Sequence, residues 1–244
     1  MDIQPLFSVL VANYNNGHYL RQTLESVKRQ TYTNWQVVIV DDGSTDDSHS
    51  IYKELEGDKR FKVVLNNTNR GCTYSKKRCI DESDGTLCGF VDADDALAPR
   101  ALETMVDVHE KNHNASVVIS RHYYCDPELS IIGESRHLHL LDNQDYLTHG
   151  DFQPEHFLSF KKNRYYLTPQ LCEENAIGDD LELLLLLEEA GDLIVLDEIL
   201  YYYRQHINSV AHSKSDECCF WNSKVIYEAC CRRHINPRSY ALNY

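Results

Sequence analysis

The sequence predicts an α/β fold in which helices flank a mostly parallel β-sheet. Short apolar runs alternate with segments of helical spacing through roughly the first half of the chain. Several runs are apolar at every position, which is typical of parallel strands covered on both faces. A helix between two such strands forms a right-handed crossover, so the strands are expected to lie parallel in one sheet.

The elements of the first half can be predicted in order. Its strands are at residues 7–11, 37–40, 61–65, 87–91 and 117–119. Its first helix follows residue 17, with Leu20, Leu24 and Val27 at helical spacing. Further helices are predicted at 47–55, at 73–83 and from Pro99 to about 113, since proline suits a first helical turn.

The second half is less regular. Between residues 121 and 175 we expect loops, short strands and a short helix. A helix at 180–190, strands at 194–196 and 199–203, and a terminal helix at 216–233 complete the chain. Because we find no internal repeat and no Gly/Ser-rich linker, a single domain is the simpler interpretation of 244 residues.

Composition excludes several classes of protein. The chain has 38 acidic and 24 basic residues, giving a formal net charge of −14, whereas binding a nucleic-acid polymer requires a basic surface. No apolar run approaches the roughly 20 residues that span a bilayer. The N-terminus lacks the basic start and apolar stretch of a signal peptide, so we expect a cytoplasmic protein with reduced cysteines.

Three polar clusters follow predicted strands, at residues 13–16, 41–46 and 92–95. Parallel strands end at the same edge of a sheet, and ligands of such sheets bind beyond that edge. We therefore expect the three clusters to converge on one edge of the sheet.

The sharpest cluster is Asp92-Ala93-Asp94-Asp95. Its carboxylates follow an apolar strand, and oxygen ligands of this kind suit Mg²⁺ or Mn²⁺, which bridge phosphates. The alternative is a solvated acidic turn, because short Asp-x-Asp strings also arise by chance.

The Asp41-Asp42-Gly43-Ser44 stretch can hydrogen-bond a base or a ribose, with Gly43 permitting close backbone approach. Its alternative is a turn that caps the following helix, and for this stretch alone that reading is favoured. Tyr14 could stack on a nucleobase or pack locally.

Two further clusters have a functional and a structural interpretation. One is a basic cluster, which either binds a diphosphate or is a solvated helix face; it consists of Asn69-Arg70-Gly71 and Lys76-Lys77-Arg78. Gly178-Asp179-Asp180 supplies either a general base or acids that favour a helix start. Similarly, His206 is either a metal ligand or a structural histidine, and Arg204 could bind phosphate or a carboxylate.

Together these motifs resemble those of the family 2 glycosyltransferases, inverting enzymes of the GT-A nucleotide-diphospho-sugar transferase fold. The resemblance runs from about Phe7 to His212 and rests on the order of seven stretches: 8–15, 40–46, 69–71, 90–95, 160–162, 180–181 and 202–209. It implies a mostly parallel, Rossmann-like sheet. It also implies a catalytic domain at 1–215, with a donor half at about 1–120 and an acceptor half at about 121–215, and a helical tail at 216–244.

The resemblance implies a role for each matching residue. Donor binding would fall to Ala12, Tyr14, Asp41, Asp42, Gly71, Lys76, Asp92, Ala93 and Asp94. Among these, Tyr14 and Asp41 match positions at the nucleobase, Asp92 the ribose and Lys76 the diphosphate. Asp94 resembles the ligand of a Mn²⁺ or Mg²⁺ cofactor, with His206 as a second metal contact. Asp180 resembles the catalytic base.

The implied reaction moves a hexose from a nucleotide-diphosphate sugar, with a UDP-sugar favoured, to a hydroxyl of a saccharide or lipid-linked acceptor. The implied setting is polysaccharide or cell-envelope glycan synthesis, with at most peripheral contact at the inner face of the membrane and scope for a homodimer. A non-catalytic nucleotide-sugar-binding protein is the alternative. A nucleotidyltransferase is a weaker alternative, since residues 13–17, the loop after the first strand, contain no basic residue.

Overall fold

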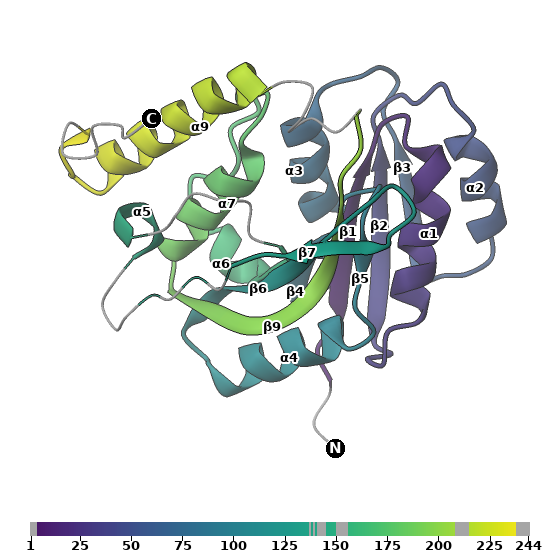
Figure 1. Ribbon diagram of the computed structural model, residues 1–244, viewed down its shortest axis with the longest axis horizontal. Coiled ribbons are helices and arrows are strands. Elements are labelled where there is room, and N and C mark those ends of the chain that lie inside the picture. Colours follow the sequence, from purple (N-terminus) through teal and green to yellow (C-terminus); the bar gives the residue numbers. More distant parts are fainter. Residues whose placement is uncertain are drawn as a thin grey trace.

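The computed structural model describes residues 4–136, 138, 140, 145–149, 156–207 and 215–237 (Figure 1). Asn208, Ser209 and His212 of the resembling region, and residues 238–244 of the expected tail, lie outside the described residues.

In the described part of the chain the sheet has nine strands, and four parallel strands form its first part (Figure 1). They are β1 (Phe7–Asn13), β2 (Trp35–Asp41), β3 (Phe61–Leu65) and β4 (Leu87–Phe90), in the order β3-β2-β1-β4. Val9 pairs with Val37, and Leu10 with Phe90. Four of the five strands predicted for the first half are confirmed here. Strands β1, β2 and β4 are buried along almost their whole length, as expected of parallel strands covered on both faces, whereas β3 is partly exposed.

The second part of the sheet is mixed. Beside β4 the order continues β8-β6-β9-β5, with β8 (Leu158–Lys161) antiparallel to both β4 and β6 (Ala115–Cys125). The long strand β9 (Asp192–Arg204) is parallel to β6, whereas β5 (Ala96–Leu97) and β7 (Ile131–Glu134) pair antiparallel with β9 and β6.

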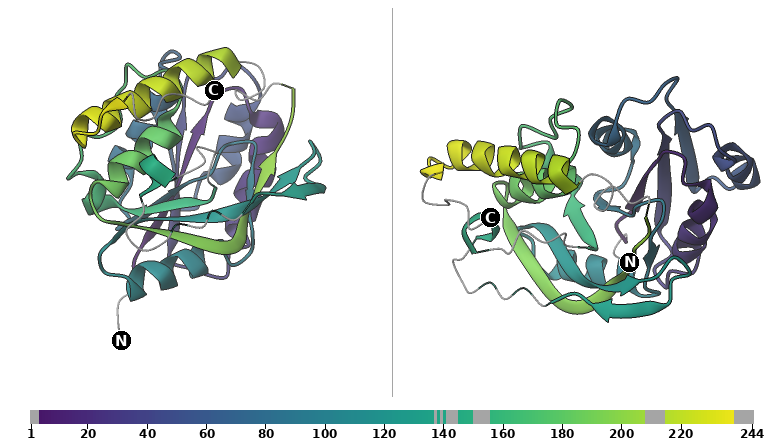
Figure 2. Two further views of the ribbon diagram at one scale, coloured as in Figure 1. Left: turned by 60° about the vertical axis from the view of Figure 1, so that its left-hand side comes forward. Right: turned by 45° about the horizontal axis from the view of Figure 1, so that its top comes forward.

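Helices cover both faces of the sheet (Figure 1). One core contains α1 (Gly17–Lys28), α2 (Ser48–Leu55) and α4 (Ala101–Lys111), which pack against Val9, Val37 and their neighbours. The opposite core contains side chains of α3 (Cys72–Glu82), α5 (Tyr146–His149), α6 (Lys162–Tyr165), α7 (Asp179–Glu188) and α9 (Ser215–Arg232). Figure 2 shows α9 lying along α7, and Val225 and Ala229 join the same core as the leucines of α7.

One prediction about the strands was wrong, and one short strand was not predicted. The predicted separate strands at 194–196 and 199–203 are one strand, β9, because its pairing with β6 continues through a bulge. Ile119 pairs with Val195 but Arg121 with Ile199, so residues 196–198 take up the irregularity, and Arg121 also binds the Asp197 carboxylate at 3.0 Å. The short β5 strand was not predicted, since two residues carry no periodic signal.

Candidate active site

The three polar clusters lie at the carboxyl ends of β1, β2 and β4, which are neighbours in the sheet. Asn13, at the end of β1, donates from Nδ2 to Asp41 Oδ2 at the end of β2, across 3.2 Å. The expected convergence is therefore confirmed. The polar side chains at this edge do not form one hydrogen-bonded group, however; they form several small groups, each with its own hydrogen bonds.

The Asp41 carboxylate is buried, with the residue 1% exposed, and satisfied by the chain itself. Oδ1 accepts from the backbone N–H groups of Gly43 and Ser44, at 3.1 and 2.8 Å. Oδ2 accepts from Asn13 and from the Tyr52 hydroxyl, the latter at 2.6 Å. Burial alone would raise the pKa of Asp41, but these donors outweigh it and hold the pKa below its ordinary value.

Asp42 ties the basic loop to the sheet edge. Its Oδ1 accepts from the backbone N–H of Arg70 and from Asn66 Nδ2, and its Oδ2 accepts from the N–H of Gly71. Gly71 has φ of +95°, a conformation that favours glycine, and it precedes the first residue of α3. Asp42 therefore fixes the start of the helix that carries Lys76.

Lys76 is the cation of the site. Its side chain is 4% exposed, and Nζ lies 2.6 Å from Asp179 Oδ2, 2.5 Å from Asp180 Oδ1 and 3.7 Å from Asp92 Oδ1. Burial alone would lower the pKa of Lys76, but the three carboxylates outweigh it and hold the pKa well above its ordinary value. The ammonium thus connects the β4 end with the start of α7.

The two aspartates that open α7 differ in their surroundings. Asp179 is buried against Lys76, and burial raises its pKa despite the attraction of that cation. The Asp180 side chain is 46% exposed. Its Oδ1 accepts from Lys76, while Oδ2 has no hydrogen-bond partner in the described parts of the chain. Asp180 therefore offers one free carboxylate oxygen at the edge of the site.

A second group forms around Asp94. His206 Nε2 lies 2.8 Å from Asp94 Oδ2, and His206 Nδ1 is buried without a partner among the residues described. Arg204, fully buried, donates through Nε to the Asp94 backbone oxygen at 2.5 Å and through its backbone N–H to Asp95 Oδ1 at 2.7 Å. Burial, with the charges of Asp94 and Asp92, raises the pKa of Asp95 well above its ordinary value.

The remaining predicted donor residues lie around these groups. Tyr14 is 47% exposed beyond the end of β1, so its ring is accessible. Ala12 is partly buried within β1. Ala93 is buried, and its carbonyl accepts a hydrogen bond from the Thr23 hydroxyl of α1, which anchors the turn between Asp92 and Asp94.

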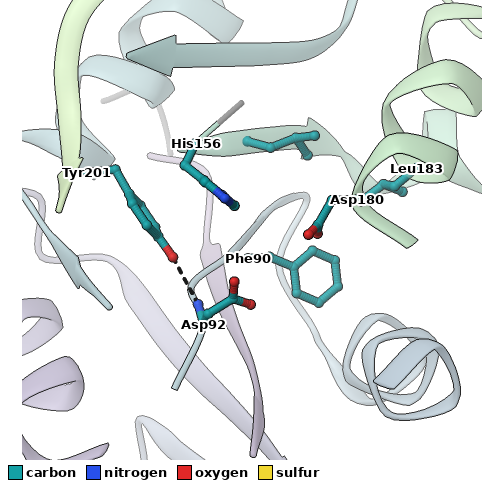
Figure 3. A pocket seen from close by; sticks show the side chains of 7 residues that line it. Phe90, Asp92, His156, Asp180, Leu183 and Tyr201 are labelled. Atoms are coloured by element: carbon teal, nitrogen blue, oxygen red, sulfur yellow. Dashed lines mark hydrogen bonds between the residues drawn. The ribbon is translucent and has the colours of Figure 1, made fainter. Parts of the chain in front are cut away.

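A pocket lies between Asp92 and Asp180 (Figure 3). Its other lining residues are Phe90, His156, Leu158, Leu183 and Tyr201. The Tyr201 hydroxyl is occupied, since it accepts from the Asp92 N–H at 3.1 Å and donates to Asp95 Oδ2 at 2.8 Å. His156 and Tyr201 line the pocket although the sequence assigned them no role. No motif marks His156, which reaches the pocket because it precedes β8.

Comparison with known proteins identifies the class. The glycosyl transferase family 2 model matches residues 8–167. The chain is 27% identical to a chondroitin synthase of Escherichia coli over 97% of its own length but 34% of that protein. It is 28% identical to the glycosyltransferase GlyG of Streptococcus pneumoniae over 86% of its length and 74% of that protein.

Solved structures agree on the fold. Staphylococcus aureus TarS in complex with UDP-GlcNAc superposes with a TM-score of 0.74 at 19% identity, covering 92% of this chain and 65% of that one. The Pyrobaculum calidifontis mannosyltransferase PcManGT, in complex with GDP-Man and Mn²⁺, gives 0.64 at 14% identity, covering 95% and 65%.

The architecture is therefore the GT-A fold predicted from the sequence. The chain belongs to glycosyltransferase family 2, since the family model covers well over half of it. Within the described residues, no helix is both long and apolar enough to cross a bilayer.

Proposed function

We propose that the chain transfers a sugar from a UDP-sugar to a hydroxyl of a saccharide or lipid-linked acceptor, with inversion, in the synthesis of a polysaccharide or cell-envelope glycan. The free Oδ2 of Asp180, beside a pocket that Asp92 also lines, is the observation that carries this proposal. The relatives named as polysaccharide synthases and the neighbour bound to UDP-GlcNAc support it.

The chain's own groups suit a direct displacement. Asp180 would accept the proton of the acceptor hydroxyl while that oxygen attacks the anomeric carbon. The bond from the anomeric carbon to the diphosphate oxygen breaks on the opposite face, and the electron pair leaves with UDP. Because Lys76 holds Asp180 Oδ1, the base stays oriented with Oδ2 toward incoming substrate.

Asp94 and His206 fit a divalent cation by donor chemistry. A carboxylate oxygen and an imidazole nitrogen suit Mn²⁺, and the two are hydrogen-bonded to each other at 2.8 Å, so a cation would take the place of that hydrogen bond. No cluster of three or more His, Cys, Asp or Glu side chains fit to hold a metal occurs among the described residues, so the diphosphate and water would complete the ligand set. When bound, the cation would supply positive charge beside the leaving diphosphate.

The two other candidate functions are not favoured. A non-catalytic nucleotide-sugar-binding protein is the less favoured alternative, because the chain keeps both Asp94 and Asp180. A nucleotidyltransferase would need a basic loop just after β1, where the chain has Asn13, Tyr14 and Asn15. The cytoplasmic location and the homodimer stay predictions.

A thermal-shift panel of UDP-, GDP- and dTDP-sugars, with and without Mn²⁺, tests the proposal. Ligands that bind the native state raise the unfolding midpoint. We expect UDP-sugars with Mn²⁺ to give the largest rise, and Asp94→Asn to remove the part that depends on Mn²⁺. A panel in which no nucleotide sugar raises the midpoint would contradict the proposed donor class.

A further inference from the structure

The imidazole of His206 lacks the hydrogen bond that usually orients a metal-binding histidine. Its Nε2 lies 2.8 Å from Asp94 Oδ2, but its Nδ1 is buried without a hydrogen-bond partner among the described residues. In most metal sites the second ring nitrogen donates to a carboxylate or a carbonyl oxygen, which fixes the direction of the ring. A cation that replaced the hydrogen bond to Asp94 would leave the imidazole with no hydrogen bond to the described chain, so its orientation depends on packing.

Tyr19 of α1 packs against this imidazole. The centroids of the two rings are 5.0 Å apart, and the ring planes are inclined by 40°. Neighbouring aromatic rings at this separation attract each other and restrict each other's rotation. Tyr19 is itself only partly buried, in the first turn of α1, so its side chain is not part of the main core.

The position of Tyr19 is fixed in turn by Arg204. The guanidinium carbon lies 4.4 Å from the Tyr19 ring centroid, which is a cation–π contact. Arg204 is 1% exposed. Its side chain donates to three oxygens of the chain, the backbone oxygens of Asp94 and Pro127 and Oε1 of Gln22. The guanidinium therefore ties α1 to the turn that carries Asp94, and holds Tyr19 in a constant place beside both candidate metal ligands.

We infer that Tyr19 is a positioning residue for the divalent cation, because its ring keeps His206 Nε2 directed toward Asp94. This step rests on the proposed function, in which Asp94 and His206 bind Mn²⁺ beside the diphosphate. Without the ring, the imidazole could rotate about its side-chain bonds, and binding the cation would have to pay for ordering it again. A residue that only filled space between α1 and the end of β9 would affect stability but not the contribution of the cation.

Calorimetry of UDP binding, with Mn²⁺ and with EDTA in its place, tests the inference. Tyr19→Leu and Tyr19→Met remove the ring, with a branched and an unbranched side chain, whereas Tyr19→Phe keeps it. Tyr166→Leu is the control, because Tyr166 also has a cation beside its ring, Lys162 Nζ at 5.8 Å, but follows α6. Pulsed electron spin resonance of the complex with Mn²⁺ and UDP gives a second readout, since a coordinated imidazole nitrogen couples to the Mn²⁺ spin.

We expect Mn²⁺ to raise the affinity of the wild type for UDP, and the variants without the ring to reduce that gain about tenfold, as is typical when a partner that orients a metal ligand is lost. Tyr19→Phe and Tyr166→Leu should keep the gain. The affinity in EDTA should be the same in every protein, and the nitrogen coupling should weaken only where the ring is missing.

The possible failures have different meanings. A gain that survives both Tyr19→Leu and Tyr19→Met, or that falls equally in Tyr19→Phe, would overturn the inference while leaving the proposed function standing. Equal UDP affinity of the wild type with Mn²⁺ and with EDTA would overturn the metal assignment and this inference, but not the transfer reaction. Failure of UDP to bind the wild type under either condition would contradict the proposed donor class, and this inference with it.

Discussion

Two groups of aspartates lie at the same edge of the sheet, and they are built differently. At the end of β2, both oxygens of Asp41 and both oxygens of Asp42 accept hydrogen bonds from neighbouring backbone and side chains. Around Lys76, by contrast, Asp180 is half-exposed and keeps a free oxygen, and Asp92 meets the cation only at 3.7 Å.

The difference separates groups that shape the site from groups free to meet a substrate. Asp41 and Asp42 hold the turn after β2 and the start of α3, so their main contribution is to stability. Asp92 and Asp180 have capacity left, so their substitution should change binding or transfer more than folding. Lys76 and Asp179 combine the two behaviours, because both are buried and Lys76 also contacts Asp180, the proposed base.

Replacing Lys76 by methionine should have the largest effect on stability. The substitution leaves Asp179 buried without its cation, a change that typically costs about 3–5 kcal/mol. Urea unfolding measures the loss. In the double variant Lys76→Met/Asp179→Leu most of the lost stability should return, because no uncompensated charge stays buried. Equal stability of Lys76→Met and the wild type would show that the buried pair has no structural role.

Asp41→Asn and Asp92→Asn compare the two groups directly. The first exchanges an acceptor for a donor opposite Tyr52 and Asn13, and should reduce the free energy of unfolding by about 2 kcal/mol. Asp92→Asn removes a partly exposed carboxylate and should reduce it by less than about 1 kcal/mol. Calorimetry should show weaker UDP-sugar binding for Asp92→Asn. The distinction fails if Asp92→Asn proves as destabilising as Asp41→Asn.

At low pH the comparison of unfolding free energies would also include the contribution of a buried histidine outside the site. Burial, with the charge of Lys161, lowers the pKa of His109 to about 4, and His109 Nε2 lies 3.1 Å from the Ser159 hydroxyl. Between pH 6.5 and about 4 the unfolded chain binds this proton and the native state does not, so stability falls as pH falls.

By pH 5 the loss should be about 2 kcal/mol for this group. Unfolding of the wild type and of His109→Gln at pH 7 and pH 5 measures it, and the variant should lose correspondingly less on acidification. The same pH dependence in both proteins would exclude His109 as its source.

The sequence predicted most of the sheet and the residue sets at its edge, because parallel strands buried on both faces leave a strong apolar signal. Asp92, Asp94, Asp180 and Lys76 were identified through motifs. The remaining residues of the site are brought there by tertiary packing. From the sequence, Asp179 could be an acid that favours a helix start, and only the packing of α3 shows that it pairs with Lys76. His156 lies at the pocket because β8 pairs antiparallel between β4 and β6. Similarly, Asp197 and Glu198 fall between two predicted strands, whereas β9 continues through them with a shift in its pairing to β6.

The most direct test of the central claim compares Asp180→Asn with Asp81→Asn. Both aspartates are about half-exposed, at 46% and 44%, and both pair with a lysine of α3. Asparagine at 180 still accepts from Lys76 but cannot take a proton. The measurement is the rate of acceptor-dependent UDP release from the tightest-binding UDP-sugar, with oligosaccharides as acceptors. We predict a loss of about a thousandfold for Asp180→Asn with unchanged UDP affinity, and no loss for Asp81→Asn. Undiminished transfer by Asp180→Asn would contradict the assignment of Asp180 as the base.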